Sequence, residues 1–165
     1  MSRQKRLPCS SLRFLGALVA VACGSSSNLT PLNLRITTLE DTVVMQRKPA
    51  GAYFNVTAIV RNDDRRSLAV ETCLTPAQRE INGVWTTVFT PNCLSGGSTP
   101  LAPGDSVVLP VRVFGYTIPN TFPPLDPRME PGRYRLLFGV RPGDSTIPTD
   151  STRGEVKPSA HFIVK

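Results

Sequence analysis

The sequence has few of the residues that most enzyme sites need. It contains one histidine and four cysteines in 165 residues. Zinc and copper sites require several His or Cys ligands, so we do not expect a transition-metal enzyme, and we interpret His161 as an ordinary residue of the last strand. The sequence also lacks a G-x-S-x-G elbow and a phosphate-binding loop that ends in Lys and Ser or Thr. We therefore expect a protein that is not an enzyme and holds no metal or other cofactor.

Long hydrophobic runs are also missing. The apolar run Phe14–Ala22 is far shorter than the ~20 residues that a membrane-spanning helix needs. It follows the basic segment Met1–Arg6 and precedes Cys23, a pattern typical of a cleaved export signal. The letters AVAC followed by GSSSN resemble the lipobox of bacterial lipoproteins, which implies that residues 1–22 are removed and that Cys23 carries lipid. The alternative is an ordinary secretory signal, with Cys23 as an incidental cysteine.

The residues after Cys23 predict a tether and a location. Gly24 stands where enterobacterial lipoproteins retained in the inner membrane have Asp. The resemblance therefore implies a protein of the bacterial cell envelope that is held by the lipid on Cys23, in the outer membrane where one exists. The stretch GSSSNLTPLN has the Ser and Gly content of a flexible spacer. The three expected parts are a signal over 1–22, a lipidated tether over 23–33 and one domain over 34–165.

The charge of the mature chain is too small to indicate a nucleic-acid partner. The whole chain has 19 basic and 12 acidic residues, a formal net charge of +7, but four of the basic residues lie before Cys23 with no acid among them. Subtracting these four leaves 15 basic against 12 acidic residues, or about +3. The remaining basic residues are interleaved with acids and lack an aromatic stacking platform, so we do not expect nucleic acid as a partner.

The four cysteines predict one disulfide. Cys9 is lost with the signal and Cys23 carries lipid, which leaves Cys73 and Cys93 as an even pair for an oxidising compartment. Between them, the Asn-Gly pair at 82–83 is a strong hairpin signal, because both residues tolerate positive φ. A two-residue turn there pairs residues whose numbers sum to 165. The numbers of Cys73 and Cys93 sum to 166, so the cysteines are one residue out of register. A bulge or a nearby proline absorbs this offset. The disulfide therefore staples the open end of this hairpin.

The distribution of proline and glycine predicts strands. The 16 prolines and 12 glycines are spread between short apolar runs and leave little room for helices. Alternation is clearest in Tyr53–Arg61, where Phe54, Val56, Ala58 and Val60 point one way. We predict an all-β fold, a single immunoglobulin-like sandwich of about seven antiparallel strands. The segments expected to form strands are Leu34–Glu40 with Thr42–Arg47 as a split first strand, Tyr53–Arg61, Ser67–Cys73, Gln78–Ile81, Val84–Phe89, Ser106–Phe114, Arg133–Arg141 and Ser159–Lys165.

Single positions carry finer predictions. Pro110 within the strand Ser106–Phe114 suggests a sheet edge or a bulge. Tyr134, at the start of its strand, resembles the tyrosine corner of immunoglobulin-like sandwiches. Trp85 is interpreted as a packed residue of the core or of a sheet face, with an exposed binding aromatic as the alternative. The acidic pair at 63–64, beside two arginines, is interpreted as a solvated turn and not as a cation site.

Four segments carry a resemblance to known families. They are FNVTAIVRNDD, INGVW, LAPGDSV and PGRYRLLFGV, between Phe54 and Val140. Together they resemble the immunoglobulin-like domains of uncharacterised bacterial lipoproteins and, more distantly, the intracellular proteinase inhibitor family. Each segment corresponds to a strand or a turn, so the resemblance implies the fold and says little about activity.

Two functions follow as expectations: a non-catalytic binding or scaffolding module with an unidentified envelope protein as partner, or a protease inhibitor or accessory domain of an envelope enzyme. Either would act through loops. The expected topology places the Gly115–Pro131 loop at the pole opposite to the Asn62–Arg66 turn and the Pro142–Pro158 stretch. An equally open alternative is that this loop folds back over the end of the sandwich. The loop residues expected to meet a partner are Tyr116, Phe122, Leu125 and Met129.

Overall fold

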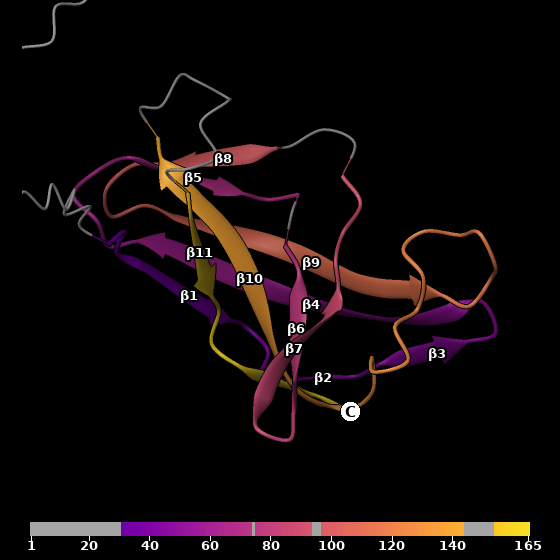
Figure 1. The fold of residues 1–165 in the computed structure, drawn as a ribbon. Helices are drawn as coiled ribbons and strands as arrows, with labels where there is room; N and C mark the ends of the chain where they lie inside the picture. Colours follow the sequence, from indigo (N-terminus) through magenta and orange to yellow (C-terminus); the bar gives the residue numbers. More distant parts are fainter. Residues whose placement is uncertain (1–30, 74, 94–96, 144–153) are drawn as a thin grey trace, which may run out of the picture. The chain divides into compact units, whose positions relative to one another are not determined.

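The computed structural model describes residues 31–73, 75–93, 97–143 and 154–165, and over these ranges the chain forms strands and turns and no helix. The strands form two sheets. The protein is an all-β sandwich of the immunoglobulin-like kind, as predicted (Figure 1). The strands are β1 (Leu34–Thr38), β2 (Thr42–Val43), β3 (Gln46–Lys48), β4 (Gly51–Asn62), β5 (Leu68–Glu71), β6 (Ala77–Ile81), β7 (Val84–Phe89), β8 (Ser98–Leu101), β9 (Ser106–Tyr116), β10 (Gly132–Pro142), β11 (Glu155–Pro158) and β12 (Phe162–Val164).

The first sheet is built around β4. One edge of β4 pairs along its whole length with β9, from Gly51 opposite Tyr116 to Arg61 opposite Ser106. The other edge pairs with β1 at one end and with β3 at the other. Among the named strands β9 pairs only with β4, so Pro110 lies on an edge strand, as its missing N–H predicted.

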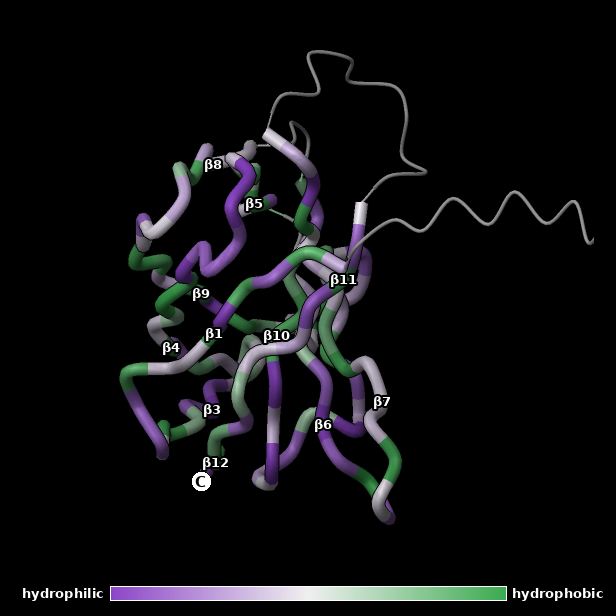
Figure 2. The backbone as a smooth tube through the Cα atoms, turned by 90° about the vertical axis from the view of Figure 1, so that its left-hand side faces the viewer, coloured by the Kyte–Doolittle hydropathy of each residue, from purple (hydrophilic) through white to green (hydrophobic). Residues whose placement is uncertain are grey.

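The second sheet is built around β10. Strands β11 and β12 pair with β10, as do β5 and β6, and these pairings are all antiparallel. The sheet continues from β5 to β8, from β6 to β7 and from β12 to β2, the last pair being parallel. The β6–β7 hairpin extends beyond the strands of its sheet, and Figure 2 shows that β6 is largely hydrophilic.

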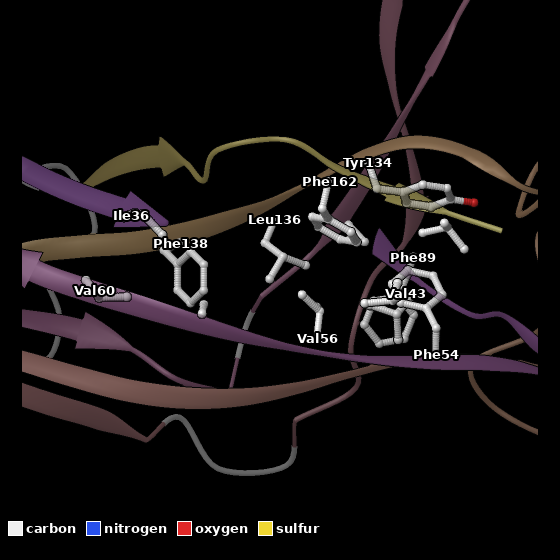
Figure 3. Packing of buried hydrophobic residues seen from close by; sticks show 14 of the residues in the cluster. Ile36, Val43, Phe54, Val56, Val60, Phe89, Tyr134, Leu136, Phe138 and Phe162 are labelled. Carbon is white, nitrogen blue, oxygen red and sulfur yellow. The ribbon is translucent and has the colours of Figure 1, made fainter. Parts of the chain in front are cut away.

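The core lies between β4 and β10, as Figure 3 shows. Alternating residues of each strand point inward, because successive side chains of a strand leave opposite faces. The ring of Phe54 meets the ring of Tyr134 edge-on, with centroids 5.2 Å apart, and Phe162 lies 6.0 Å from Phe54. The inward residues of the two central strands, all predicted from the alternation, are Phe54, Val56, Ala58, Val60, Tyr134, Leu136, Phe138 and Val140.

The β6–β7 hairpin confirms the predicted turn and its register. Asn82 and Gly83 have φ values of 51° and 78°, and Ile81 pairs with Val84. The predicted bulge is also present, because the register shifts by one residue between Ala77 and Gln78. The shift corrects one expected pair: Ala77 faces Phe89, so the register no longer places Thr75 opposite Thr90.

The predicted disulfide joins Cys73 and Cys93, whose Cα atoms are 6.0 Å apart. Cys73 lies between β5 and β6. Strand β5 pairs with β10 over Val140–Pro142, and β6 pairs with β10 over Tyr134–Leu136. The bridge therefore lies beside the middle of the sandwich, at the point where the chain passes from β5 to β6.

Three short strands differ from the prediction or were not predicted. Strand β3 forms a separate hairpin with β4, whereas the sequence suggested the continuation of the first strand. Strand β8 contains Pro100 and pairs only with β5, and β11 falls in the stretch Pro142–Pro158, which was expected to be irregular. Each has three or four residues, too few for a periodic pattern to stand out.

The two ends of the sandwich have the predicted loops. The end with Leu34, Asn62 and Pro142 is called the proximal pole, because the chain joins the domain there. The end with Gly51 and Tyr116 is called the distal pole, and Figure 1 places β3 and the loop after β9 together at it. The predicted signal, Cys23 and most of the spacer lie outside the described residues. Within the part of the chain that is described, no helix is long and apolar enough to cross a membrane.

Candidate functional site

The loop after β9 is held in place by its own backbone. Thr117 donates from its amide N to the Ala50 carbonyl over 3.0 Å and from its hydroxyl to the Pro49 carbonyl over 2.6 Å. The loop then returns alongside the end of β9, where the Leu125 amide donates to the Tyr116 carbonyl over 2.8 Å. A loop fixed in this way loses little conformational entropy when it binds a partner.

The four loop residues predicted to meet a partner separate into two groups. Phe122 and Tyr116 are exposed, at 61% and 37%. Leu125 is half-buried against the core, and Met129 is 2% exposed within it. The prediction that Met129 faces a partner is therefore wrong, because the loop folds back at that residue, as the alternative predicted. Ile118, which the sequence analysis did not single out, is 51% exposed.

Tyr134 fixes the end of the loop where β10 begins. Its hydroxyl donates to the Glu130 carbonyl over 2.6 Å, which is the tyrosine corner that the sequence predicted. The ring is fully buried between Phe54 and Phe162. Burial disfavours the phenolate and raises the pKa of Tyr134 to about 12, so the hydroxyl keeps its proton and its role as donor throughout the physiological range.

A second brace joins the loop to the β6–β7 hairpin. Arg79 donates to the Arg128 carbonyl over 3.0 Å, and the Arg128 guanidinium contacts the Thr87 carbonyl at 3.4 Å. Arg128 also binds the Asp126 carboxylate, with its Nη2 at 2.6 Å. The hydrogen bond from the Arg128 side chain is the main reason that the pKa of Asp126 lies below its usual range. The base of the loop is thus tied to β6, β7 and β10. Its tip carries Ile118 and Phe122.

A small pocket of about 160 Å³ lies beside the loop, at the end of β4 and β9. We call it the distal pocket. Gly51 and Gly115 allow the backbones around it to approach closely, because a Cβ atom on Gly51 would lie 2.0 Å from the Gly115 carbonyl oxygen and one on Gly115 would lie 2.6 Å from the Leu125 Cα. The side chains that line it are Lys48, Tyr53, Arg112, Phe114 and Tyr116, with Ala50 and Ala52.

Two cations and three rings make up this lining. The Arg112 guanidinium lies over the Tyr53 ring at 4.9 Å and over the Phe114 ring at 5.6 Å, and the Lys48 amine lies 5.5 Å from the Tyr53 centroid. The rings of Phe114 and Tyr116 meet edge-on at 5.5 Å. These are favourable contacts between cations and aromatic faces, and they hold the positive charges at the mouth of the pocket.

The positive charge of the distal pocket is not balanced by the rest of the described chain. No carboxylate of the described residues forms an ion pair with Lys48 or Arg112. Two acids of the loop after β9 and one of β6 pair with arginines instead. These pairs are Asp126 with Arg128, Glu80 with Arg133 and, at 3.9 Å, Glu130 with Arg79.

Sequence reasoning missed this pocket. Nothing in the sequence set the register that brings Phe114 opposite Tyr53. Register outside a tight hairpin depends on the fold as a whole. The only local signal was an aromatic residue and a cation at outward positions of two long strands.

The other residues considered from the sequence are structural. Trp85 is half-buried on the face of the second sheet, with the Arg135 guanidinium 4.5 Å from its ring. Asp63 forms ion pairs with Arg35 and Arg61, and its side chain is only 21% exposed, so the turn is ion-paired and less solvated than predicted. His161 is exposed just before β12. No group of three or more His, Cys, Asp or Glu residues that could hold a metal ion occurs among the residues described.

Comparison with known proteins gives no family for this chain. No family model and no curated protein matches it. Among solved structures, it is similar to the structural genomics target SoR45, with 14% identity and a TM-score of 0.42 over 81% of this chain and 83% of that one. A protein from Archaeoglobus fulgidus has 15% identity and a TM-score of 0.39 over 81% and 96%. A CARDB domain from Pyrococcus furiosus, in complex with di-metal ions, has 15% identity and a TM-score of 0.32 over 81% and 89%.

Proposed function

We propose that this protein is a lipid-anchored protein of the bacterial cell envelope whose sandwich is a non-catalytic binding module that meets its protein partner at the distal pole. The observation that carries the proposal is the loop after β9. Phe122 is 61% exposed at its tip, while hydrogen bonds to β9 and to the β3–β4 turn fix the backbone on both sides. An exposed aromatic side chain on a fixed loop binds at a low cost in entropy.

The position of the loop supports the same proposal. The predicted tether joins the domain at the proximal pole, and β4 runs from there to the distal pole over 12 residues, which is roughly 40 Å at ~3.3 Å per residue. A partner bound at Phe122 is therefore at the far end of the domain from the point where the chain leaves for Cys23. The basic and apolar segments before Cys23 and the Ser/Gly spacer after it support the anchor itself.

The same loop supports the second candidate function, a protease inhibitor or an accessory domain of an envelope enzyme. An inhibitor presents a fixed loop to a protease cleft, and the braced residues around Phe122 would suit that role. Incubation of the protein with periplasmic proteases tests it. Inhibition with a defined stoichiometry supports the inhibitor, and slow cleavage without inhibition removes it.

The anchor is tested by mass spectrometry of the protein isolated from bacterial membranes. We expect a mature N-terminus at Cys23 that bears acyl chains, and we expect Cys23→Ala to release the protein from the membrane fraction. A free Cys23 thiol, or a mature N-terminus elsewhere, would contradict the anchor and leave the sandwich unaffected.

The binding surface is tested by affinity capture from envelope fractions. Val84 is exposed to the same degree as Phe122, 63% against 61%, but lies at the β6–β7 turn, so Val84→Ser is a matched control for Phe122→Ser. We expect Phe122→Ser to lower the amount of partner captured at least tenfold and Val84→Ser to leave it unchanged. Equal capture by both variants would contradict binding through the loop.

A further inference from the structure

The distal pocket lies beside the proposed binding loop and differs from it in chemistry. Tyr116 belongs to both, because it ends β9 inside the pocket and begins the loop that carries Phe122. The loop tip offers apolar side chains, whereas the pocket offers Lys48 and Arg112 over aromatic rings. A partner that covers the loop tip would therefore also meet two positive charges.

We infer that the distal pocket receives a carboxylate side chain from an acidic segment of the protein partner. This inference rests on the proposed function and adds the chemistry of the partner to it. Lys48 and Arg112 have no ion pair with a carboxylate of the described residues, whereas Asp126, Glu130 and Glu80 each pair with another arginine. Because no described carboxylate neutralises these two cations, we assign the complementary negative charge to the partner, as expected of complementary potentials across an interface.

The size and composition of the pocket favour a peptide over other anions. A volume of about 160 Å³ holds a single side chain. Tyr and Arg are the residues that most often contribute large binding energies at protein interfaces, and both are present here with the apolar tip of the loop adjacent. Nucleic-acid binding relies on many phosphate contacts, and two uncompensated cations do not provide them.

The roles of the lining residues follow from their positions. Arg112 lies over Tyr53 and Phe114, so its aliphatic stem and guanidinium are partly shielded from water on one side and its outer N–H groups are free to donate to a carboxylate. Lys48 lies at the end of β3 over the Tyr53 ring and supplies a second positive charge. Tyr53 keeps the two cations in place and is a positioning residue.

The test measures peptide binding to the full chain, inserted in nanodiscs of phosphatidylcholine so that the membrane is neutral. The probe is the acetylated peptide Glu-Glu-Phe-Glu-Glu with an uncharged dye, and the matched probe is Gln-Gln-Phe-Gln-Gln. We expect the acidic peptide to bind at least tenfold more tightly at about 50 mM salt, with most of this preference lost at about 500 mM because salt screens exposed charges.

Paired variants separate the pocket from the net charge. Lys48→Gln combined with Arg112→Gln should weaken binding of the acidic peptide about tenfold. Arg65→Gln combined with Arg141→Gln removes the same charge near the proximal pole and should change binding less than about twofold. Arg112→Lys keeps the charge and should retain more binding than Arg112→Gln. Equal losses in the two double variants would overturn the inference, because they would show a non-specific effect of charge.

The outcomes also separate this inference from the proposed function. Equal binding of the two peptides overturns the inference, and so does binding to phosphatidylglycerol vesicles without a preference for the acidic peptide, which would indicate a lipid headgroup. In either case, capture of a partner that depends on Phe122 would leave the proposed function standing. If neither the peptide nor a Phe122-dependent partner binds, both fail.

Discussion

The two poles of the sandwich place cations in different surroundings. At the proximal pole the carboxylates are matched by cations: Asp63 binds Arg35 and Arg61, and Asp64 binds Arg66 at 2.8 Å. At the distal pole the cations of the pocket lie over aromatic rings and no described carboxylate neutralises them.

Exposed apolar side chains occur near both poles but are grouped differently. Ile118 and Phe122 share one loop at the distal pole, whereas Val108 and Val156, toward the proximal pole, are exposed singly on strands. Apolar residues exposed singly are ordinary on a protein surface, whereas exposed apolar residues grouped together mark a candidate interaction site. We therefore propose a structural role for the proximal pole and a binding role for the distal pole.

The largest expected loss of stability comes from a change between the two poles. Replacing both cysteines, with Cys73→Ser and Cys93→Ser, opens a loop of 20 residues and should lower the free energy of unfolding by about 3 kcal/mol in the chain-entropy account. The measurement is urea unfolding of the oxidised protein and the double variant. Because the bridge lies between the poles, partner capture at a temperature where the variant is folded should be unchanged, and a loss of capture there would weaken the separation of roles.

The next effect tests the proximal pole. Asn62 is fully buried, and its amide donates to the carbonyls of Arg66 and Leu101 over 2.9 and 3.0 Å while its side-chain oxygen accepts from the Asp64 amide. Asn62→Ala leaves these groups without partners and should destabilise the fold by about 2 kcal/mol. Urea unfolding measures the loss. Capture of the partner by folded Asn62→Ala should match the wild type, and a capture defect would place binding at this pole instead.

A smaller effect tests how the distal loop is held. Tyr134→Phe keeps the ring in the core and removes the hydrogen bond to the Glu130 carbonyl, which should cost about 1 kcal/mol in unfolding free energy. Faster amide hydrogen exchange is expected at 126–130 and not at the Asn62–Arg66 turn. A uniform rise in exchange at both poles would mean that the corner stabilises the whole sandwich and not the loop.

The smallest expected effect is on the stability of the fold at acidic pH. The pKa of Asp64 lies below its usual range, mainly because the Arg66 side chain donates to it and also because the Asn33 amide does. A carboxyl with a lowered folded-state pKa stabilises the fold above its unfolded value of about 3.9, and this contribution is lost as the pH falls below that value. The unfolding free energy should therefore decrease from about pH 5 to about pH 2, and less steeply in Asp64→Asn. Parallel curves for the two proteins would contradict this role of Asp64.

Much of the fold could be predicted from the sequence because its long strands carry a clear alternation. The inner faces of β4 and β10 and the Asn82-Gly83 hairpin depend on local rules of side-chain direction and turn geometry. The bulge that the cysteine spacing implied is present as well. The short strands β8 and β11 could not be predicted, because pairing with a neighbouring strand and not their own sequence decides that they are strands.

The candidate site was harder to predict than the fold. The sequence indicated the loop after β9 as a candidate, but not that Phe122 would be exposed while Met129 is buried, since this depends on where the loop turns back. The distal pocket needs the register of β4 against β9 and the packing of Arg112 on Tyr53, both of which are set by contacts between segments far apart in the chain.

The most direct test of a binding role for the distal pole is photo-crosslinking in bacteria that express the protein. A photoreactive phenylalanine analogue is placed at position 122 in one strain and, as the control of equal exposure, at position 84 in another. The account predicts a discrete crosslinked protein from position 122 that position 84 does not give. A crosslink from position 84 alone, or the same product from both positions, would contradict the assignment of binding to the distal pole.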